Sequence, residues 1–363
     1  MADPKPMTYA SSGVDYDPLD AFKRACQREA GRTVDLLQRH GMAEARGTRG
    51  ESAYLVDAGD GTFLAHVEEG LGTKNLVADA IGDPALYHGI GIDTVATIVN
   101  DLITVGCLPA VVAMHAAVGD GAWFANEERA SALAAGFAEG CKRAGATWGG
   151  GETPALSGLV EPSTIVLAGS AIGRMKASDR ITADIQVGDK MVFLASTGVQ
   201  TNGLTLCRRI GDRVGYDQPC GETTYGRALL SPSAIYVDFV RELLASGVRP
   251  SYLVHLTGHG FRKLMRAERE LVYRVDEPGE PLPIFDFIQQ HGPVERREML
   301  ATFNMGVGFV AYVRPDDADA TVRAATSAGH RAWIAGEVVR DGEKAVELPT
   351  LGERFGTGDL EVR

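Results

Sequence analysis

The sequence predicts a two-domain α/β protein, and three observations lead to this prediction. The chain has 363 residues, which is enough for two domains of ordinary size. Short apolar runs typical of strands alternate with amphipathic runs typical of helices in both halves. A charged segment, residues 176–189, ends in a Gly-Asp turn between the two halves. We therefore expect a tail at 1–18, an N-terminal domain at 19–178 and a C-terminal domain at 179–363.

The individual elements are indicated by hydrophobic periodicity and by turn residues. A turn at residues 58–61 between two β-rich runs predicts a hairpin, and Gly145 is suited to end the alanine-rich helix before it. In the N-terminal half, helices are expected at 20–39, 74–80, 93–105 and 126–144, and strands at 54–57, 62–67, 110–115 and 163–172. In the C-terminal half, strands are expected at 190–195 and 305–313, and a third strand should end near residue 255. Helices are expected at 235–245 and 317–328, and two more should begin at Gly203 and at Phe261.

The composition restricts the classes of partner and compartment. The chain carries 48 acidic and 36 basic residues, a net charge of −12, so nucleic acid and acidic membrane surfaces are not expected partners. Its five cysteines are scattered and form no Cys-x-x-Cys pair, which favours a reducing compartment over disulfides or structural zinc. Because the first residues lack the apolar core of a signal peptide and no run has membrane-spanning length, we expect a cytoplasmic protein.

The segment at residues 89–101 carries the strongest signal for a bound cation. Its apolar residues recur at helical spacing, so it should be an amphipathic helix. Asp93 stands where a helix needs an N-cap, which is an ordinary explanation for its carboxylate. Asn100 and Asp101 lie inside an apolar run, where an unpaired carboxylate is costly to bury. A cation would relieve that cost, and Mg²⁺ prefers oxygen ligands of this kind.

A glycine turn at residues 70–74 is a candidate phosphate site. It lies between an expected strand and an expected helix, so backbone N–H groups at Gly70, Gly72 and Thr73 can face an anion, and Lys74 supplies a point charge. The spacing is not that of a Walker A motif. A capped helix with solvated charges explains the same residues equally well, so both interpretations stay open at this point.

A second glycine turn precedes Glu152 and Thr153. The glycines at residues 149–151 leave these two side chains on a bare backbone. Glu152 suits a metal or a ribose hydroxyl in that position. The alternative is an ordinary surface turn.

Two polar segments in the C-terminal half are candidates for substrate binding and catalysis. The turn at residues 197–203 presents amides and N–H groups that suit an anionic substrate, although Thr201 or Asn202 capping the next helix is the alternative. His255 ends an expected strand beside a glycine turn. An imidazole there suits general acid–base catalysis, although a lone histidine is more often a satisfied hydrogen-bonding residue.

Seven motifs occur in an order that is specific for one superfamily, although each is modest alone. They lie at residues 9–15, 70–74, 91–101, 150–153, 231–237, 255–258 and 298–308. Over nearly the whole chain they resemble the aminoimidazole ribonucleotide (AIR) synthase family, also called phosphoribosylformylglycinamidine cyclo-ligase. The same superfamily includes selenophosphate synthetase, thiamine-monophosphate kinase and a hydrogenase-maturation enzyme.

The resemblance implies an ATP-dependent ligase of purine synthesis that activates an amide oxygen of formylglycinamidine ribonucleotide and closes a ring to form AIR. It implies a two-domain fold and a homodimer in which the N-terminal domains share a β-barrel, with ATP and Mg²⁺ near the interface. The implied metal ligands are Glu69, Asp93 and Asp101. The implied ATP contacts are Gly70, Gly72, Thr73, Lys74, Asn100, Gly151, Glu152 and Thr153. The implied substrate contacts are Asn202, Gly203, Thr257 and Gly258, and the implied catalytic residues are His255 and Lys74.

Four departures from the family pattern concern the substrate rather than the fold. Gln200 replaces a histidine, Ala301 replaces an arginine, Met114 lies where the family has Leu-Asp-Tyr, and Gln27 aligns with a lysine, although Lys23 is near. Two alternatives therefore stay open. One is a related enzyme that uses ATP to activate or phosphorylate a different small molecule, and the other is a non-catalytic nucleotide-binding homologue. Lys74, Asp93 and Asp101 are intact and speak against the second, although the family has an aspartate where this chain has Glu69.

Overall fold

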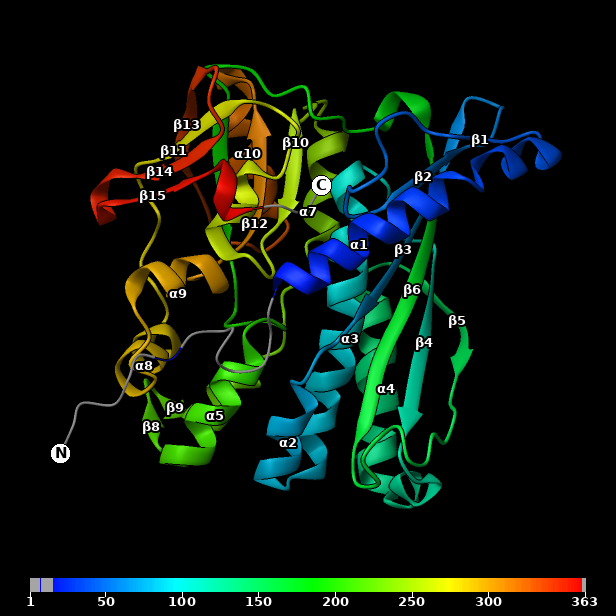
Figure 1. The fold of residues 1–363 in the computed structure, drawn as a ribbon, viewed down its shortest axis with the longest axis vertical. Coiled ribbons are helices and arrows are strands. Elements are labelled where there is room, and N and C mark those ends of the chain that lie inside the picture. The colour runs from blue at the N-terminus through cyan, green and yellow to red at the C-terminus, as the bar shows by residue number, and fades with distance from the viewer. Residues whose placement is uncertain (1–6, 8–15, 361–363) are drawn as a thin grey trace.

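The computed structural model of the chain describes residue 7 and residues 16–360. The expected tail at 1–18 and the motif at 9–15 therefore lie almost entirely outside the described residues. The described chain forms two large sheets with helices packed against them, a mixed α/β fold of two parts (Figure 1). The first sheet ends at Lys176 and the second begins at Lys190, on either side of the expected boundary. Among the residues that the structure describes, no helix is long and apolar enough to cross a membrane.

The N-terminal part is built on a six-stranded sheet. Its strand order is β1-β2-β3-β6-β4-β5, and only β4 and β5 pair in parallel. The long helix α3 packs against β3 and β6 and also against α4. The strands are β1 (Ala43–Glu44), β2 (Tyr54–Asp57), β3 (Thr62–Gly70), β4 (Val111–Val118), β5 (Thr147–Glu152) and β6 (Ile165–Lys176), and the helices are α2 (Asn75–Ile81), α3 (Tyr87–Leu102) and α4 (Glu127–Arg143). The expected hairpin, strands and alanine-rich helix are thereby confirmed.

The C-terminal part is built on a seven-stranded sheet. Its order is β10-β12-β7-β13-β11-β14-β15, with only β11 and β14 in parallel. The strands are β7 (Lys190–Ala195), β10 (Tyr252–His255), β11 (Leu271–Val275), β12 (Val307–Val313), β13 (Ala332–Asp341), β14 (Ala345–Leu348) and β15 (Glu353–Gly356). The helices are α5 (Leu204–Val214), α6 (Tyr225–Leu229), α7 (Val237–Ala245), α8 (Pro283–His291), α9 (Arg296–Thr302) and α10 (Ala318–Ser327), and β8 (Pro219–Cys220) pairs with β9 (Thr223–Thr224).

Helix α3 begins earlier than its sequence pattern predicted. The expected start was Asp93, but the helix begins at Tyr87, so Asp93 lies in its interior and is not an N-cap. Gly91 in this segment allows close helix packing: a Cβ on it would lie 2.4 Å from the backbone nitrogen of Phe137 in α4. A side chain there would push the two helices apart. Gly91 is therefore required for packing rather than for a turn.

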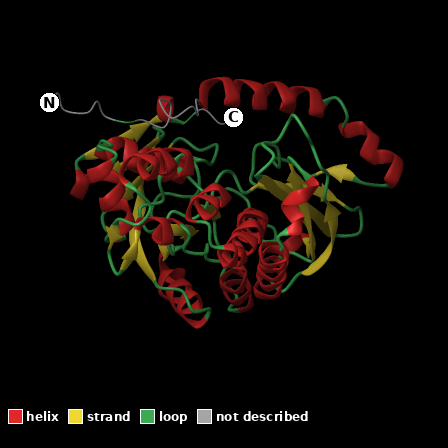
Figure 2. Ribbon diagram, turned by 90° about the horizontal axis from the view of Figure 1, so that it is seen from below, coloured by secondary structure: helices red, strands yellow, loops and turns green. Residues whose placement is uncertain are grey.

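The first expected helix, 20–39, is divided in the structure. Helix α1 (Tyr16–Gly31) is followed by a 3-10 helix (Val34–His40) that ends at Gly41 in the left-handed region, with a φ of 68°. Helix α1 lies on the outside of the molecule (Figure 2), and Phe22 is 70% exposed. Its apolar residues therefore do not form a buried face.

Candidate active site

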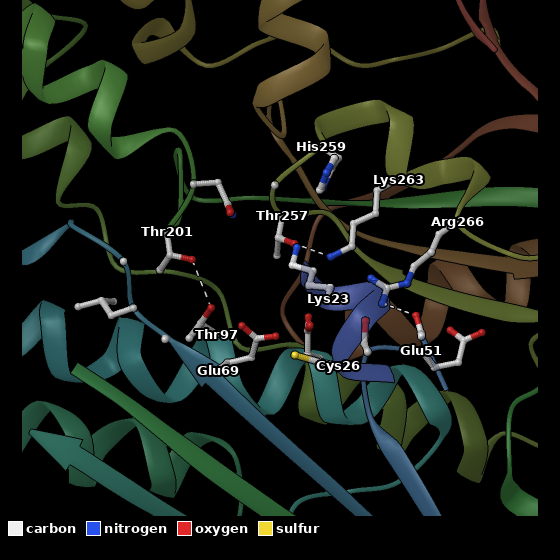
Figure 3. A pocket seen from close by; sticks show the side chains of 18 of the residues that line it. Lys23, Cys26, Glu51, Glu69, Thr97, Thr201, Thr257, His259, Lys263 and Arg266 are labelled. Atoms are coloured by element: carbon white, nitrogen blue, oxygen red, sulfur yellow. Dashed lines mark hydrogen bonds between the residues drawn. The ribbon is translucent and has the colours of Figure 1, made fainter. Parts of the chain in front are cut away.

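A cavity of about 640 Å³ lies between the two parts of the chain (Figure 3). The end of β3 and the C-terminal half of α3 form its floor, and α1 and the segments around residues 201 and 258 close it. The lining residues are Phe22, Lys23, Cys26, Gln27, Gly50, Glu51, Ser52, Glu69, Gly70, Leu71, Gly72, Thr97, Asp101, Thr201, Asn202, Thr257, Gly258, His259, Lys263 and Arg266. The cavity thus joins several of the predicted metal, phosphate and substrate positions.

Two carboxyl groups, Glu69 and Asp101, meet on the floor of this cavity. Burial raises the pKa of Glu69 to about 8, and the neighbouring Asp101 adds to the increase. For Asp101, burial alone would raise the pKa, but Lys263 and a hydrogen bond from His255 hold it well below its ordinary value. Near neutral pH, Asp101 is therefore ionised while Glu69 retains a proton and donates it to Asp101.

Two cations face the carboxyl pair from the C-terminal part. Lys263 is buried, and its Nζ donates a hydrogen bond to the hydroxyl of Thr257 (Figure 3). Burial lowers the pKa of Lys263 to about 8, although Asp101 and Glu69 oppose this shift. The Nη2 of Arg266 donates to the carbonyl of Gly50 at 2.8 Å. The cavity therefore combines carboxylates with fixed positive charges, the combination that suits a phosphate group and its metal ion.

The predicted metal ligands are only partly brought together. Glu69 and Asp101 meet, but Asp93 lies elsewhere on α3 and does not line the cavity. Across the described residues, no group of three or more His, Cys, Asp or Glu side chains is placed to hold a metal ion. Two facing carboxylates are nevertheless the set with which proteins hold Mg²⁺ when phosphate and water supply its remaining ligands. A divalent cation would also replace the proton that the pair now shares.

Asp93 and Lys74 form an ion pair with each other, and neither lines the cavity. The Lys74 Nζ lies 2.8 Å from the Asp93 carboxylate, and both side chains are fully buried. Lys74 also donates to the carbonyl of Ser231 at 2.8 Å, and Asp93 accepts from the backbone N–H of Ser233 at 2.7 Å. The pair thus fastens α2 and α3 to the segment before α7. Because the two charges neutralise each other and both side chains hydrogen-bond to this segment, the pair serves the contact between the two parts.

Asn100 forms a second fastening of the same segment. Its Nδ2 donates to the carbonyl of Ala234 at 2.8 Å, and its Oδ1 accepts from the N–H of Tyr236 at 2.9 Å. The predicted ATP contact is therefore engaged with the backbone in this structure. Of the turn at 70–74, Gly70 and Gly72 line the cavity, whereas Thr73 does not.

The predicted ATP contacts on β5 lie at a different place. Gly151, Glu152 and Thr153 line a separate, open hollow together with Met114 and Trp148. All six residues of β5 are exposed at the edge of the first sheet. Within one chain, the structure does not bring these residues to the carboxyl pair.

Most predicted substrate contacts do reach the cavity. Asn202, Thr257 and Gly258 line it, and the Nδ2 of Asn202 is buried without a hydrogen-bond partner in the described structure. Such an orphaned donor fits a polar ligand. Gly203 does not line the cavity; it precedes α5 with a φ of 72°, and a Cβ there would collide with the ring of Phe303.

His255 stands behind Asp101 rather than in the cavity. It is 3% exposed, and its Nδ1 lies 2.6 Å from Asp101 Oδ1. Burial lowers the pKa of His255, although Asp101 opposes the shift, so the ring is neutral and donates its Nδ1 proton to the carboxylate. His255 therefore orients a carboxylate that belongs to the other part of the chain, a contact that sequence reasoning did not anticipate.

The contact with Asp101 predicts that His255 acts through that carboxylate. We expect His255→Phe to lower turnover roughly ten- to a hundredfold, the usual effect of removing an outer partner of a metal ligand. His255→Gln retains a donor and should lose less. The informative measurement is the Mg²⁺ concentration that gives half-maximal activity, which should rise in the Phe variant. An unchanged Mg²⁺ requirement in both variants would contradict this role.

The raised pKa of Glu69 predicts that the ligand-free protein loses stability as the pH rises. Between the ordinary value of 4.5 and about 8, the folded protein keeps a proton on Glu69 that the unfolded chain has released. Folding therefore takes up a proton in this range, and stability falls from about pH 4.5 to about pH 8. The melting temperature of the Glu69→Gln protein should depend less on pH than that of the parent. At pH 8 it should be higher than the melting temperature of the parent.

The adjacent, exposed Glu68 supplies the control for that measurement. Glu68→Gln removes the same charge from outside the carboxyl pair and should leave the pH dependence of the parent intact. Parallel melting profiles for the parent and Glu69→Gln would show that Glu69 does not retain a proton.

Several cavity residues were missed by sequence reasoning. Lys263 and Arg266 lie three residues apart in and just after a 3-10 helix (Gly260–Met265), which replaces the helix expected from Phe261. That spacing places two cations on one face, and it is the sequence feature from which these two residues could have been predicted. The other missed residues, Cys26, Glu51 and Thr97, carry no motif of their own.

Two of the departures noted in the sequence are packing residues. Gln200 is buried with a φ of 56°, and its Nε2 donates to the hydroxyl of Tyr236 at 3.2 Å. Ala301 is buried in α9, and its carbonyl accepts two hydrogen bonds from Arg262. By contrast, Gln27 lines the cavity, with Lys23 one helical turn earlier.

The fold and the cavity define a member of a known class. Residues 50–175 match the model of the AIR synthase related protein, N-terminal domain, and residues 186–349 match its C-terminal domain. The chain therefore belongs to the AIR synthase related protein family, which confirms the resemblance drawn from its motifs.

Its relatives include enzymes with a defined name. A phosphoribosylformylglycinamidine cyclo-ligase of Methanothermobacter thermautotrophicus is 36% identical over 348 residues, covering 94% of this chain and 97% of the relative. A protein of the same name from Sorangium cellulosum is 36% identical over 361 residues, covering 95% and 99%. The fold is also similar to hydrogenase maturation protein HypE in complex with ATP, with a TM-score of 0.59, 18% identity and coverage of 82% and 85%.

Proposed function

We propose that this protein is an ATP-dependent cyclo-ligase that converts formylglycinamidine ribonucleotide into AIR. The observation that carries the proposal is the carboxyl pair, Glu69 and Asp101, faced by Lys263 and Arg266 in a cavity between the two parts. Relatives that bear the cyclo-ligase name over nearly their full length support it. An amide oxygen is a poor leaving group, and phosphorylation by ATP converts it into a good one.

Each cavity residue has a role under this proposal. Glu69 and Asp101 would hold Mg²⁺, which when bound neutralises charge on the transferring phosphoryl group. Lys263 and Arg266 pair with phosphate oxygens, and Asn202 donates its unpaired N–H to the substrate. The phosphoryl group passes from ATP to the amide oxygen, the internal amine forms the C–N bond, and the C–O bond breaks as phosphate leaves.

One assay tests both the proposed reaction and the alternative, a different substrate. ADP release and AIR formation are measured with formylglycinamidine ribonucleotide and with a panel of other phosphorylated metabolites, with Asp101→Asn as the inactive reference. We expect turnover with the first compound only. Turnover with another compound would indicate a related enzyme of different specificity, which the presence of Gln27 in the cavity favours. No ADP release with any compound would indicate a binding protein.

We also propose a homodimer formed through the first sheet. Residues of β6 alternate between buried and exposed, and α3 packs against one face of the strand. On the other face Val166 is 49% and Ile172 is 51% exposed. A second copy would cover this face.

The five unpaired cysteines fit a reducing compartment such as the cytoplasm.

The dimer proposal predicts the effect of a charge on this face. Light scattering at micromolar concentration should give twice the chain mass for the parent, and Ile172→Asp should shift the protein towards the chain mass. Ile334, which is 39% exposed in β13 of the second sheet, offers the matched control, Ile334→Asp. A monomeric parent, or equal effects of the two substitutions, would contradict the proposal.

A further inference from the structure

A second cavity, of about 370 Å³, lies where the two parts of the chain join. Three arginines line it, and each comes from a different segment. Arg46 follows β1 in the first part, Arg180 lies in the connection after β6, and Arg269 precedes β11 in the second part. Two carboxylates, Glu51 and Glu268, share the lining. The cavity therefore has an excess of positive charge in a chain whose net charge is −12.

The hydrogen bonds that Arg180 and Arg269 make go to backbone carbonyls. Among residues 16–360, none of the three lies within ion-pair distance of a carboxylate. Burial lowers the pKa of Arg180, and the attraction of Glu51 opposes this only in part. Arg180 donates to the carbonyl of Arg46, and Arg269 donates to the carbonyl of Ala183 at 3.5 Å. The Nε of Arg180 is buried and has no hydrogen-bond partner in the described structure. A buried, unsatisfied guanidinium nitrogen calls for an acceptor that the chain itself does not provide.

We propose that this cavity binds a phosphate or pyrophosphate group of a small molecule, at a site separate from the active site. Guanidinium groups match phosphate oxygens in planar, charge-assisted hydrogen bonds. The site goes beyond the cyclo-ligase reaction, which uses the larger cavity.

The position of the site links it to the active site. Because the arginines belong to the first part, the connection and the second part, a bound anion holds all three together. The connection itself is fastened on both sides, since Ile181 N–H donates to the Val105 carbonyl and Asp184 N–H to the Ser251 carbonyl. Glu51 lines both cavities and accepts a hydrogen bond from the hydroxyl of Tyr252 at 2.7 Å. Binding at the arginines therefore stiffens one wall of the active cavity.

Calorimetric titration with pyrophosphate, without Mg²⁺, tests the proposal. The titration is made in Lys263→Met protein, so that binding in the active cavity is weakened. We expect Arg180→Gln and Arg269→Gln, added singly to this protein, to weaken pyrophosphate binding at least tenfold. Arg274→Gln, which removes an exposed arginine paired with Asp276 outside the cavity, should leave binding unchanged.

Two results would overturn the proposal: no pyrophosphate binding up to millimolar concentration, or equal affinity in all variants. Arg269 is exposed and makes one long contact, so its substitution keeps the fold even if Arg180→Gln does not. Because the titration measures binding and requires no turnover, failure of the proposed reaction would leave its outcome unaffected.

Discussion

Asp101→Asn should lower turnover roughly a thousandfold, the upper range for removing one electrostatic contact to a transition state. Asp101 contacts Glu69 and accepts the hydrogen bond of His255, and its charge is balanced by Lys263. Asparagine keeps the size of the side chain but not the charge. The cavity then retains its cations and loses the carboxylate that would attract Mg²⁺. Calorimetry should therefore also show weaker binding of Mg-ATP.

An exposed aspartate serves as the control for this substitution. Asp60→Asn removes the same charge from a surface ion pair with Arg174 and should leave turnover within twofold of the parent. Circular dichroism establishes that both variants fold. Parent-like turnover and Mg-ATP affinity in Asp101→Asn would remove Asp101 from the site.

Lys263→Met is expected to lower turnover roughly a hundred- to a thousandfold. Lys263 is buried beside Asp101 and donates to Thr257, so it is a cation that interacts with both the carboxyl pair and the predicted substrate turn. Its pKa of about 8 adds a second expectation. The lysine loses its proton as the pH rises through 8, so turnover of the parent should decline above that pH. Lys263→Arg keeps its charge and should not show the decline.

The matched control is Lys142→Met, which removes an exposed lysine at the end of α4. It should leave both turnover and its pH profile unchanged. A Lys263→Met enzyme with the turnover of the parent would show that the cation is only structural. A decline above pH 8 that persists in Lys263→Arg would assign the titration to another group.

Local pattern was sufficient where an element is bounded by turns and carries its own periodicity. The strands β3, β4, β6, β7 and β12 and the helices α4, α7 and α10 lie where the sequence predicted them. The start of α3 was misplaced because Gly89 and Gly91 are residues that usually end helices, whereas Gly91 here allows contact with α4. The strands from β13 to β15 were not predicted at all.

The sequence by itself determined the family, the two α/β parts and the segments that carry the candidate site. Only the tertiary structure decided which polar side chains face the cavity. Asp93 and Asp101 lie on the same helix, yet one binds Lys74 in the interior and the other meets Glu69 at a cavity. The physical reason is that a charge must be paired wherever it is buried. Some of the partners come from segments more than a hundred residues away, as Ser231 does for Lys74 and His255 for Asp101. Periodicity reports which side of a helix is polar, but the identity of the partner depends on how distant segments pack.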